Sequence, residues 1–192
     1  MCVSRCIVKI VEIQNPPSVE ALVNRFGRQP FSFVLDSAQS NDGLGEWSFF
    51  GAEPFQIVTG DLANLRQAMQ PHQIKAHPKI PCTGGAVGYL RYDDGRRLET
   101  LASLAEDDRL IPDMHFGLYD GVAALNHETG VLFLVGHAFS IPADAVTERL
   151  LATVGPRSVT AATYGRKQAS TATTSRTPLT SKSPSQPTQW HG

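Results

Sequence analysis

The stretch that most limits what this chain can fold into is "HFGLYDGVAALNHETGVLFLVGHAF", residues 115 to 139. Two runs rich in Val, Leu, Phe and Ala flank "NHETG" at 126 to 130, and a turn segment between two such runs is typical of a β-hairpin. Gly130 supplies a residue that takes a positive φ without steric cost. The segment therefore predicts two neighbouring antiparallel strands, and so a β-containing fold.

The rest of the first 154 residues alternates short strands with helices. A Val- and Ile-rich run predicts a strand over 3–13, and Ser18 is a good N-cap for a helix that Gly27 ends. Asp61 is expected to cap a second helix over 62–69, and residues 142–154 form an amphipathic third. Further strands are expected at 30–38 and on both sides of Glu53-Pro54 within 47–60, because proline cannot donate to a central ladder. Residues 71–81 are proline-rich and predict an irregular connection. We expect an α+β domain over residues 5–154, with antiparallel strands and packed helices.

Charge divides the chain where this pattern stops. Residues 1–154 hold 12 basic and 18 acidic residues, a net charge of −6, whereas residues 155–192 hold five basic residues and no acidic ones. Ser, Thr, Pro and Gly make up more than half of that tail, so little apolar surface is available to offset the entropy of ordering it. We expect 155–192 to be a disordered basic tail. A spacer or a sequence read out of frame explains it better than an anion-binding or nucleic-acid-binding arm.

Cysteine usage and hydropathy favour a cytoplasmic protein. Cys2, Cys6 and Cys82 cannot all pair and form no Cys-x-x-Cys motif, which favours free thiols in a reducing compartment. The apolar N-terminal run is interrupted by Lys9 and Glu12 and is shorter than the roughly 20 residues that a membrane span needs. We expect neither a membrane nor a nucleic-acid partner.

No self-contained active site emerges from the residue patterns. Gly84, Gly85 and Gly88 lack both the Lys-Ser or Lys-Thr of a Walker loop and the spacing of a dinucleotide fingerprint, which favours a bend or close packing over a phosphate cradle. His72, His77 and Cys82 could meet in one loop, but no zinc-type spacing supports a metal site. The pairs Asp93-Asp94 and Asp107-Asp108 lie in polar, solvated stretches, and Ser37 lacks a nucleophile elbow. We therefore predict no catalytic residue and no metal ligand in this chain.

Three segments, in order and at consistent spacing, resemble a known family. "PFSFVLDSA" at 30–38 is similar to a Leu-Leu-(Glu/Asp)-Ser segment, and "WSFFGAEPF" at 47–55 to an Arg-(Tyr/Trp)-Ser-Phe-x-Gly-x-(Asp/Glu)-Pro segment. "GGAVGYLRYDDGRRLE" at 84–99 is similar to Gly-Gly-x-x-Gly-Tyr-x-x-Tyr-(Asp/Glu). Together they resemble the N-terminal domain of the chorismate-utilising component I enzymes, which include anthranilate synthase and aminodeoxychorismate synthase component I.

The resemblance implies an effector pocket and not a catalytic site. In this family the N-terminal domain forms part of a pocket for tryptophan feedback, which carries over to Leu35, Asp36, Ser37 and Ser48. Glu46 stands where the family usually has Arg, and the other wall of the pocket belongs to the catalytic domain. The chorismate pocket and the Mg²⁺-binding glutamates lie in that domain, which nothing after residue 154 resembles. We expect the chain alone to be inactive and to contain no cofactor, with a catalytic domain and a glutaminase subunit as the implied partners.

Two choices stay open. The short segment before residue 31, and the residues of the second motif together with "GLYDGVAALNHETG" at 117–130, look more like aminodeoxychorismate synthase, which serves para-aminobenzoate and folate synthesis, than like anthranilate synthase, which serves tryptophan synthesis. The chain is then either the N-terminal part of such an enzyme, with a frameshift or shortened gene behind the tail, or a non-catalytic regulatory or assembly module.

Overall fold

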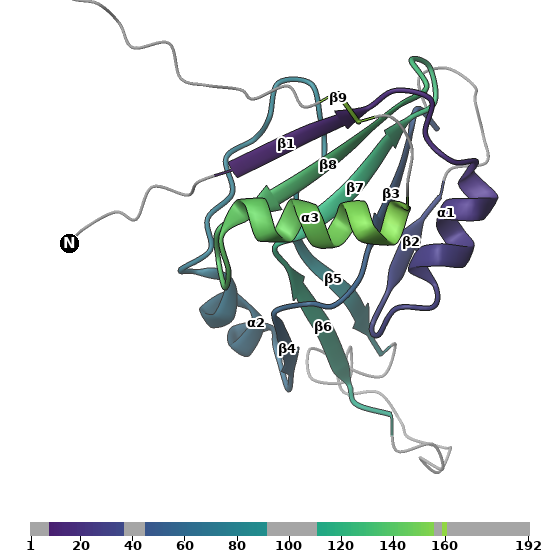
Figure 1. Ribbon diagram of the computed structural model, residues 1–192. Helices are drawn as coiled ribbons and strands as arrows, with labels where there is room; N and C mark the ends of the chain where they lie inside the picture. The colour runs from purple at the N-terminus through teal and green to yellow at the C-terminus, as the bar shows by residue number, and fades with distance from the viewer. Residues whose placement is uncertain (1–7, 37–44, 92–110, 156–158, 161–192) are drawn as a thin grey trace, which may run out of the picture.

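A computed structural model describes residues 8–36, 45–91, 111–155 and 159–160, and these form two antiparallel sheets with three helices. The six-stranded sheet has the order β2-β3-β7-β8-β1-β9, and the three-stranded sheet has the order β4-β6-β5 (Figure 1). The strands are β1 (Val8–Ile13), β2 (Phe33–Leu35), β3 (Trp47–Gly51), β4 (Gln56–Thr59), β5 (Gly85–Leu90), β6 (Met114–Tyr119), β7 (Gly121–Asn126), β8 (Val131–His137) and β9 (Val159–Thr160). The helices are α1 (Val19–Phe26), α2 (Leu62–Met69) and α3 (Ala143–Val154). The predicted α+β class is confirmed.

The helix ends follow the expected local chemistry. Ser18 caps α1 by accepting a hydrogen bond from the Ala21 N–H at 3.3 Å, and Asp61 caps α2 by accepting one from the Asn64 N–H at 2.9 Å. Each bond satisfies a donor that the first helical turn leaves without an intrahelical partner. Gly130 has a φ of +66° and ends the turn between β7 and β8, as predicted.

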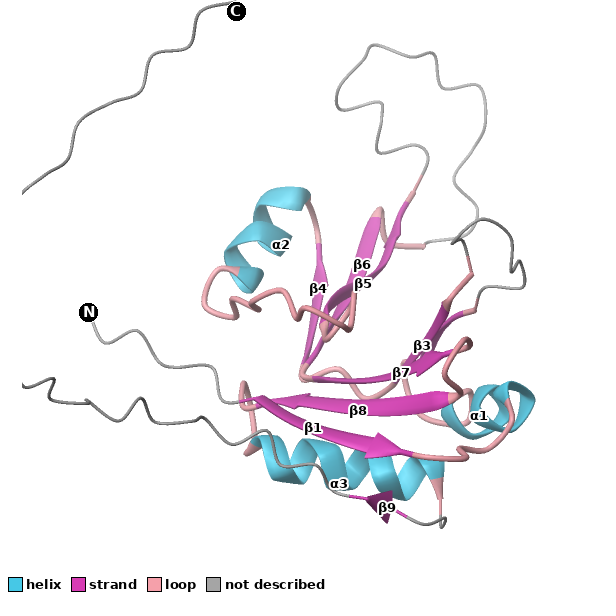
Figure 2. Ribbon diagram, turned by 90° about the horizontal axis from the view of Figure 1, so that it is seen from above, coloured by secondary structure: helices cyan, strands magenta, loops and turns pink. Residues whose placement is uncertain are grey.

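The predicted hairpin around "NHETG" is present, but the run before the turn contains two strands instead of one. β7 and β8 pair antiparallel, but the run before the turn is two strands, because β6 belongs to the three-stranded sheet and β7 to the six-stranded sheet. The change occurs at Asp120, whose buried carboxylate accepts hydrogen bonds from Arg149 Nη2 at 2.7 Å and Ser140 Oγ at 2.9 Å. In Figure 2 the three-stranded sheet stands away from the other, so this residue joins the two.

Two further boundaries differ from the sequence-based expectation. Within 30–36, the described part of the strand expected over 30–38, the strand is β2. It begins only at Phe33, because Phe31 takes a positive φ of 48° and its carbonyl accepts a hydrogen bond from the Tyr119 hydroxyl at 2.7 Å. Burial raises the pKa of this Tyr119 hydroxyl. Beyond residue 154, β9 pairs with β1 inside the segment expected to lack regular structure. Residues 161–192, Cys2 and Cys6 lie outside the described residues, whereas Cys82 is a free thiol.

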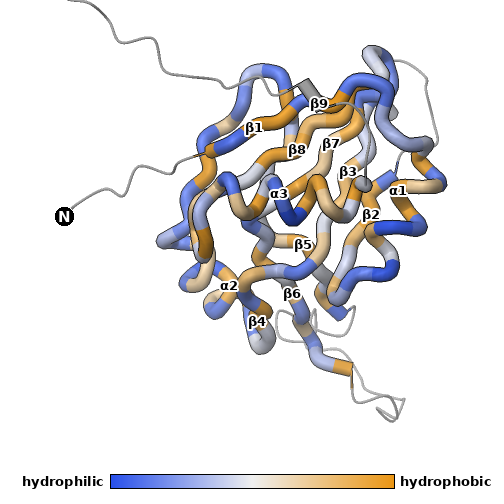
Figure 3. The backbone as a smooth tube through the Cα atoms, viewed as in Figure 1, coloured by the Kyte–Doolittle hydropathy of each residue, from blue (hydrophilic) through white to orange (hydrophobic). Residues whose placement is uncertain are grey.

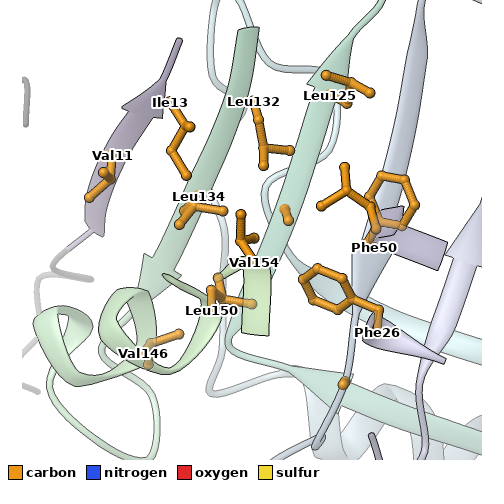
Figure 4. Packing of buried hydrophobic residues seen from close by; sticks show 13 residues of the cluster. Val11, Ile13, Phe26, Phe50, Leu125, Leu132, Leu134, Val146, Leu150 and Val154 are labelled. Carbon is orange, nitrogen blue, oxygen red and sulfur yellow. The ribbon is translucent and has the colours of Figure 1, made fainter. Parts of the chain in front are cut away.

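One face of the six-stranded sheet carries the main hydrophobic core. Alternate residues of β1, β3, β7 and β8 point toward α1 and α3, and Figure 4 shows Phe26 and Phe50 lying together among them, with ring centroids 5.7 Å apart. In Figure 3 the central strands of this sheet are mainly hydrophobic and the surrounding loops mainly hydrophilic. Gly121 and Gly136 are register partners beneath α3, where a Cβ on Gly121 would come within 2.6 Å of the Val146 side chain. The glycine pair therefore lets α3 lie close to the sheet.

Candidate functional site

The predicted effector residues that the structure describes, Leu35, Asp36 and Ser48, lie at one end of the strands β2, β3 and β7. The register places Leu35 opposite Phe49 and Ser48 opposite Leu125, so Asp36, which follows β2, comes beside Ser48. On the other side of β3, the backbone N–H of His127 donates to the Glu46 carbonyl at 2.8 Å. Antiparallel pairing thus brings residues from three distant parts of the chain to a single strand end.

Ser48 lies at the centre of a hydrogen-bonded group that also contains Asp36 and His127. Ser48 Oγ donates to Asp36 Oδ1 at 2.5 Å and lies 2.7 Å from His127 Nε2. A serine hydroxyl has one hydrogen, so with that hydrogen on the Asp36 side, His127 Nε2 must be the donor to Ser48 Oγ. Ser48 is fully buried, whereas Asp36 and His127 are exposed.

This direction of donation decides what the group can do chemically. A nucleophilic serine needs a base that accepts its proton, and here His127 donates to the hydroxyl instead. The Ser48 hydroxyl donates its hydrogen to the Asp36 carboxylate, and this hydrogen bond holds one carboxylate oxygen in place. The arrangement suits a fixed, solvent-accessible carboxylate that binds a cationic or hydrogen-bond-donating ligand, and it does not suit acyl transfer.

The structure brings together three of the four predicted effector residues. The side chains of Asp36 and Ser48 meet at this strand end, Leu35 lies there with its side chain on the opposite face of the sheet, and Ser37 lies outside the described residues. His127 was missed, because in the sequence it reads as part of the "NHETG" turn. His127 directly follows β7, and β7 pairs with β3, the strand that contains Ser48. This position could have indicated that His127 lies near Ser48, but the pairing of β3 with β7 is not evident from the sequence.

The glycines of the third motif have a structural role where the structure describes them. Gly84 and Gly85 have φ values of +149° and +127°, which other residues rarely adopt. A Cβ on Gly88 would come within 2.1 Å of the His115 carbonyl oxygen, so only glycine allows β5 and β6 to approach this closely. The prediction of a bend and close packing is confirmed for these residues.

Close packing also explains the glycine at position 51, in the second motif. A Cβ there would meet the Phe33 ring at 2.2 Å, and Phe33 belongs to the first motif. The Phe33 ring also meets Tyr119 edge to face, with centroids 4.7 Å apart. The first two motifs therefore pack directly against each other.

The other candidate groups form no metal site in the described part of the chain. His77 Nδ1 accepts hydrogen bonds from the N–H groups of Lys79 and Ile80, while the His72 ring packs edge to face on Phe55. Among the described residues, no group of three or more His, Cys, Asp or Glu side chains could hold a metal ion. The pairs Asp93-Asp94 and Asp107-Asp108 lie outside those residues. No helix within 8–36, 45–91, 111–155 and 159–160 is long and apolar enough to cross a membrane.

A buried histidine lies beside the junction of the two sheets. His137 Nε2 donates to the Thr83 carbonyl at 2.8 Å, and its backbone N–H donates to the Asp120 carbonyl at 2.7 Å. Burial lowers the pKa of His137, although the bond to Thr83 and the charge of Asp120 act in the opposite direction. With Arg149 held by Asp120, this buried group fastens the connection before β5 to the core.

The sequence is similar to component 1 of two kinds of enzyme, anthranilate synthase and aminodeoxychorismate synthase. The sequence is 32% identical to anthranilate synthase component 1 of Mycolicibacterium smegmatis over 153 residues, which covers 69% of this chain and 29% of that protein. It is 26% identical to aminodeoxychorismate synthase component 1 of Escherichia coli over 141 residues, covering 62% of this chain and 31% of that protein. The Klebsiella aerogenes aminodeoxychorismate synthase component 1 is 39% identical over 77 residues, covering 40% of this chain and 16% of that protein. No family model matches the sequence. The chain spans less than a third of the length of these curated relatives.

Proposed function

Because the chain is homologous to the N-terminal parts of anthranilate synthase component 1 and aminodeoxychorismate synthase component 1, we propose that it is the N-terminal scaffold and effector-binding part of such an enzyme. Within that family we assign it to aminodeoxychorismate synthase, which converts chorismate to 4-amino-4-deoxychorismate for para-aminobenzoate synthesis. The observation that carries the proposal is the Asp36–Ser48 pair, which two of the shared motifs supply at one strand end. Anthranilate synthase is the alternative.

The site supports a binding role through its charge and geometry. Asp36 presents a carboxylate to solvent, and Ser48 holds one of its oxygens from below. A carboxylate fixed in this way is a good partner for the ammonium group of an amino acid, because a charged hydrogen bond is stronger than a neutral one. Leu35, another predicted residue at this strand end, points to the other face of the sheet with Phe49, so it adds no surface beside the Asp36 carboxylate. The proposed ligand is tryptophan, as the family resemblance implies.

The catalytic role belongs to the part of the relatives that this chain does not match. In the proposed full-length enzyme that part binds chorismate and Mg²⁺, and a glutaminase subunit supplies ammonia. We expect the purified 192-residue chain, given chorismate, Mg²⁺ and an ammonium salt, to form no aminated product. Measurable conversion would contradict the proposal.

A growth experiment separates the two enzymes. Residues 1–154 would replace the matching part of the Escherichia coli aminodeoxychorismate synthase component 1, and the joined protein would be expressed in cells that require para-aminobenzoate. We expect growth without the supplement, whereas the Escherichia coli protein without its N-terminal part should give none. A parallel join to the Mycolicibacterium smegmatis anthranilate synthase component 1, tested in cells that require tryptophan, reports on the alternative. Growth in the second test alone would assign the chain to anthranilate synthase.

The preformed Asp36–Ser48–His127 group also supports a second candidate, a regulatory module that binds the effector by itself. Titration calorimetry of the chain with tryptophan tests it. A dissociation constant below about 1 mM, which corresponds to roughly 4 kcal/mol, would favour the module if binding is lost in Ser37→Ala and Ser48→Ala. We expect no measurable binding, because the open strand end leaves much of the ligand in water.

A further inference from the structure

A hollow of about 550 Å³ lies between helix α2 and β4, an edge strand of the three-stranded sheet, and we call it the β4–α2 groove. All four residues of β4 line it. Neighbouring residues of a strand point to opposite faces of the sheet, so a hollow that borders all four runs along the free edge of the strand. Figure 1 shows α2 beside β4 at this edge.

The helix supplies the second wall of the groove. Asn64, Gln67 and Ala68 of α2 line it, and residues three and four positions apart share one face of a helix. Ala68 also packs against the hydrophobic cluster that contains the buried Val58 of β4, which holds α2 against the sheet. The groove therefore has two fixed walls, a strand edge on one side and a helix face on the other.

The free edge of β4 carries backbone groups that can pair with another strand. In an edge strand, alternate residues direct their N–H and C=O groups away from the sheet. Within the described residues, the Thr59 carbonyl, which accepts from Asn64 Nδ2 at 3.3 Å, is the one backbone group of β4 that bonds outside the three-stranded sheet. The other outward groups of this strand lie along the groove.

The side chains of the groove indicate which kind of ligand suits it. None of the lining residues is Asp, Glu, Lys or Arg. Gln56 of β4 and Gln67 of α2 are exposed, and their amides make no hydrogen bond within the part of the chain that the structure describes. A side-chain amide both donates and accepts, as a peptide group does, whereas an anion requires donors and a cation requires acceptors. The groove therefore suits a peptide backbone better than a charged ligand.

We propose that the β4–α2 groove binds an extended, uncharged peptide segment of another polypeptide, which adds to the three-stranded sheet as a fourth strand beside β4. In this mode of binding the main-chain hydrogen bonds give the affinity and the side-chain pockets give the specificity. The groove lies on the three-stranded sheet, whereas the Asp36–Ser48–His127 group lies on the six-stranded sheet. The inference therefore goes beyond the proposed function and does not depend on it.

The experiment uses the full ¹⁵N-labelled chain, and the probe is the uncharged hexapeptide acetyl-Thr-Val-Thr-Val-Thr-Gln amide. Strand addition pairs the outward N–H groups of β4, so we expect the amide resonances of β4 to shift and their hydrogen exchange to slow. The control probe is the same peptide with every backbone nitrogen methylated. It keeps the side chains but has no backbone donor, and we expect it not to bind.

Matched variants of α2 locate the binding. Gln67→Trp places a large side chain in the groove and should weaken peptide binding about tenfold or more. Arg66→Trp is the control, because Arg66 is exposed on the same helix but does not line the groove, and it should leave the affinity unchanged. Both positions are exposed, so neither variant replaces a buried side chain, and circular dichroism checks that both fold.

Three results would overturn the inference. Equal binding of the methylated peptide would show that its side chains are recognised and its backbone is not. Binding that shifts the amides of β5 instead of β4, and that Gln67→Trp leaves unchanged, would place strand addition on the other edge of the sheet. No binding at about 1 mM peptide, roughly 4 kcal/mol, would exclude the peptide as the occupant. If that chain sediments as a dimer that Gln67→Trp dissociates, a second copy occupies the groove. The growth experiment decides the proposed function in every case.

Discussion

The two faces of the six-stranded sheet are built from the same strands yet differ in what covers them. Toward α1 and α3, Phe50, Leu132 and Leu134 are completely buried, whereas their chain neighbours Phe49 and Phe133 on the opposite face of the sheet keep contact with water. Neighbours along a strand differ only in the side to which they point. From this difference in burial we expect the helix-covered face to contribute most of the stability.

The sharpest test of this contrast is a pair of adjacent phenylalanines. Phe50→Ala leaves a cavity beside Phe26 and should lower the free energy of unfolding by about 3–5 kcal/mol. Phe49→Ala removes a partly exposed ring and should cost only about 1–2 kcal/mol. Urea unfolding of the two full-length variants measures both. Equal losses would mean that both faces contribute alike to stability.

A second test adds volume to the covered face where α3 lies closest. Gly121→Ala places a Cβ within 2.6 Å of Val146 and should destabilise the fold by about 1–3 kcal/mol, because α3 must move away from the sheet. Gly130→Ala is a useful comparison, since nothing lies within 4 Å of its Cβ and its cost comes from the positive φ alone. Thermal unfolding that is unchanged in Gly121→Ala would show that the helix is not held tightly.

The strand end that carries the proposed effector site should contribute less. Ser48→Ala removes the hydroxyl between Asp36 and His127 and should cost about 1–2 kcal/mol, the usual effect of losing a buried hydrogen-bonding group. Ser140→Ala removes the hydroxyl that an exposed serine donates to Asp120, should cost less, and serves as the control away from the site. Chemical unfolding measures both, and tryptophan calorimetry should respond to Ser48→Ala alone if the site binds.

The smallest effect concerns His137, on the face of the six-stranded sheet opposite α1 and α3, where the connection before β5 covers the strands. Burial lowers the pKa of His137 below its usual 6.5, so between that lower value and 6.5 the unfolded chain binds more protons than the folded chain. Stability should therefore fall as the pH drops below about 6.5. His137→Gln keeps a donor for the Thr83 carbonyl and should flatten this dependence. An unchanged difference between pH 7.5 and 5.5 would show that other groups cause it.

Local signals in the sequence predicted local structure well. Ser18 and Asp61 cap the helices that they were expected to cap, and the β7–β8 turn and the break at Glu53-Pro54 lie where the residues indicate. These features depend on a few neighbouring residues, so their physical cause is visible in the sequence.

Features that depend on distant pairing were not predicted. The sequence around Asp120 reads as one continuous strand, because Arg149, which holds its carboxylate, lies on a helix formed much later in the chain. His127 joins the site only through the pairing of β3 with β7. Asp36 and Ser48 were assigned through the family resemblance, since their residue types alone gave no reason to place them together.

The pairing of β1 with β8 has a consequence for how the protein is made. Val8 lies opposite His137, so the first strand gains its neighbour on the β8 side only after nearly the whole domain has been synthesised. At the usual elongation rate of about 5–20 residues per second, β1 waits on the ribosome for roughly 6–26 s before β8 appears. During that time a Val- and Ile-rich strand without its partner is exposed to aggregation and available to chaperones. Production of this chain in cells should therefore depend more on elongation rate and chaperone supply than its final stability would suggest.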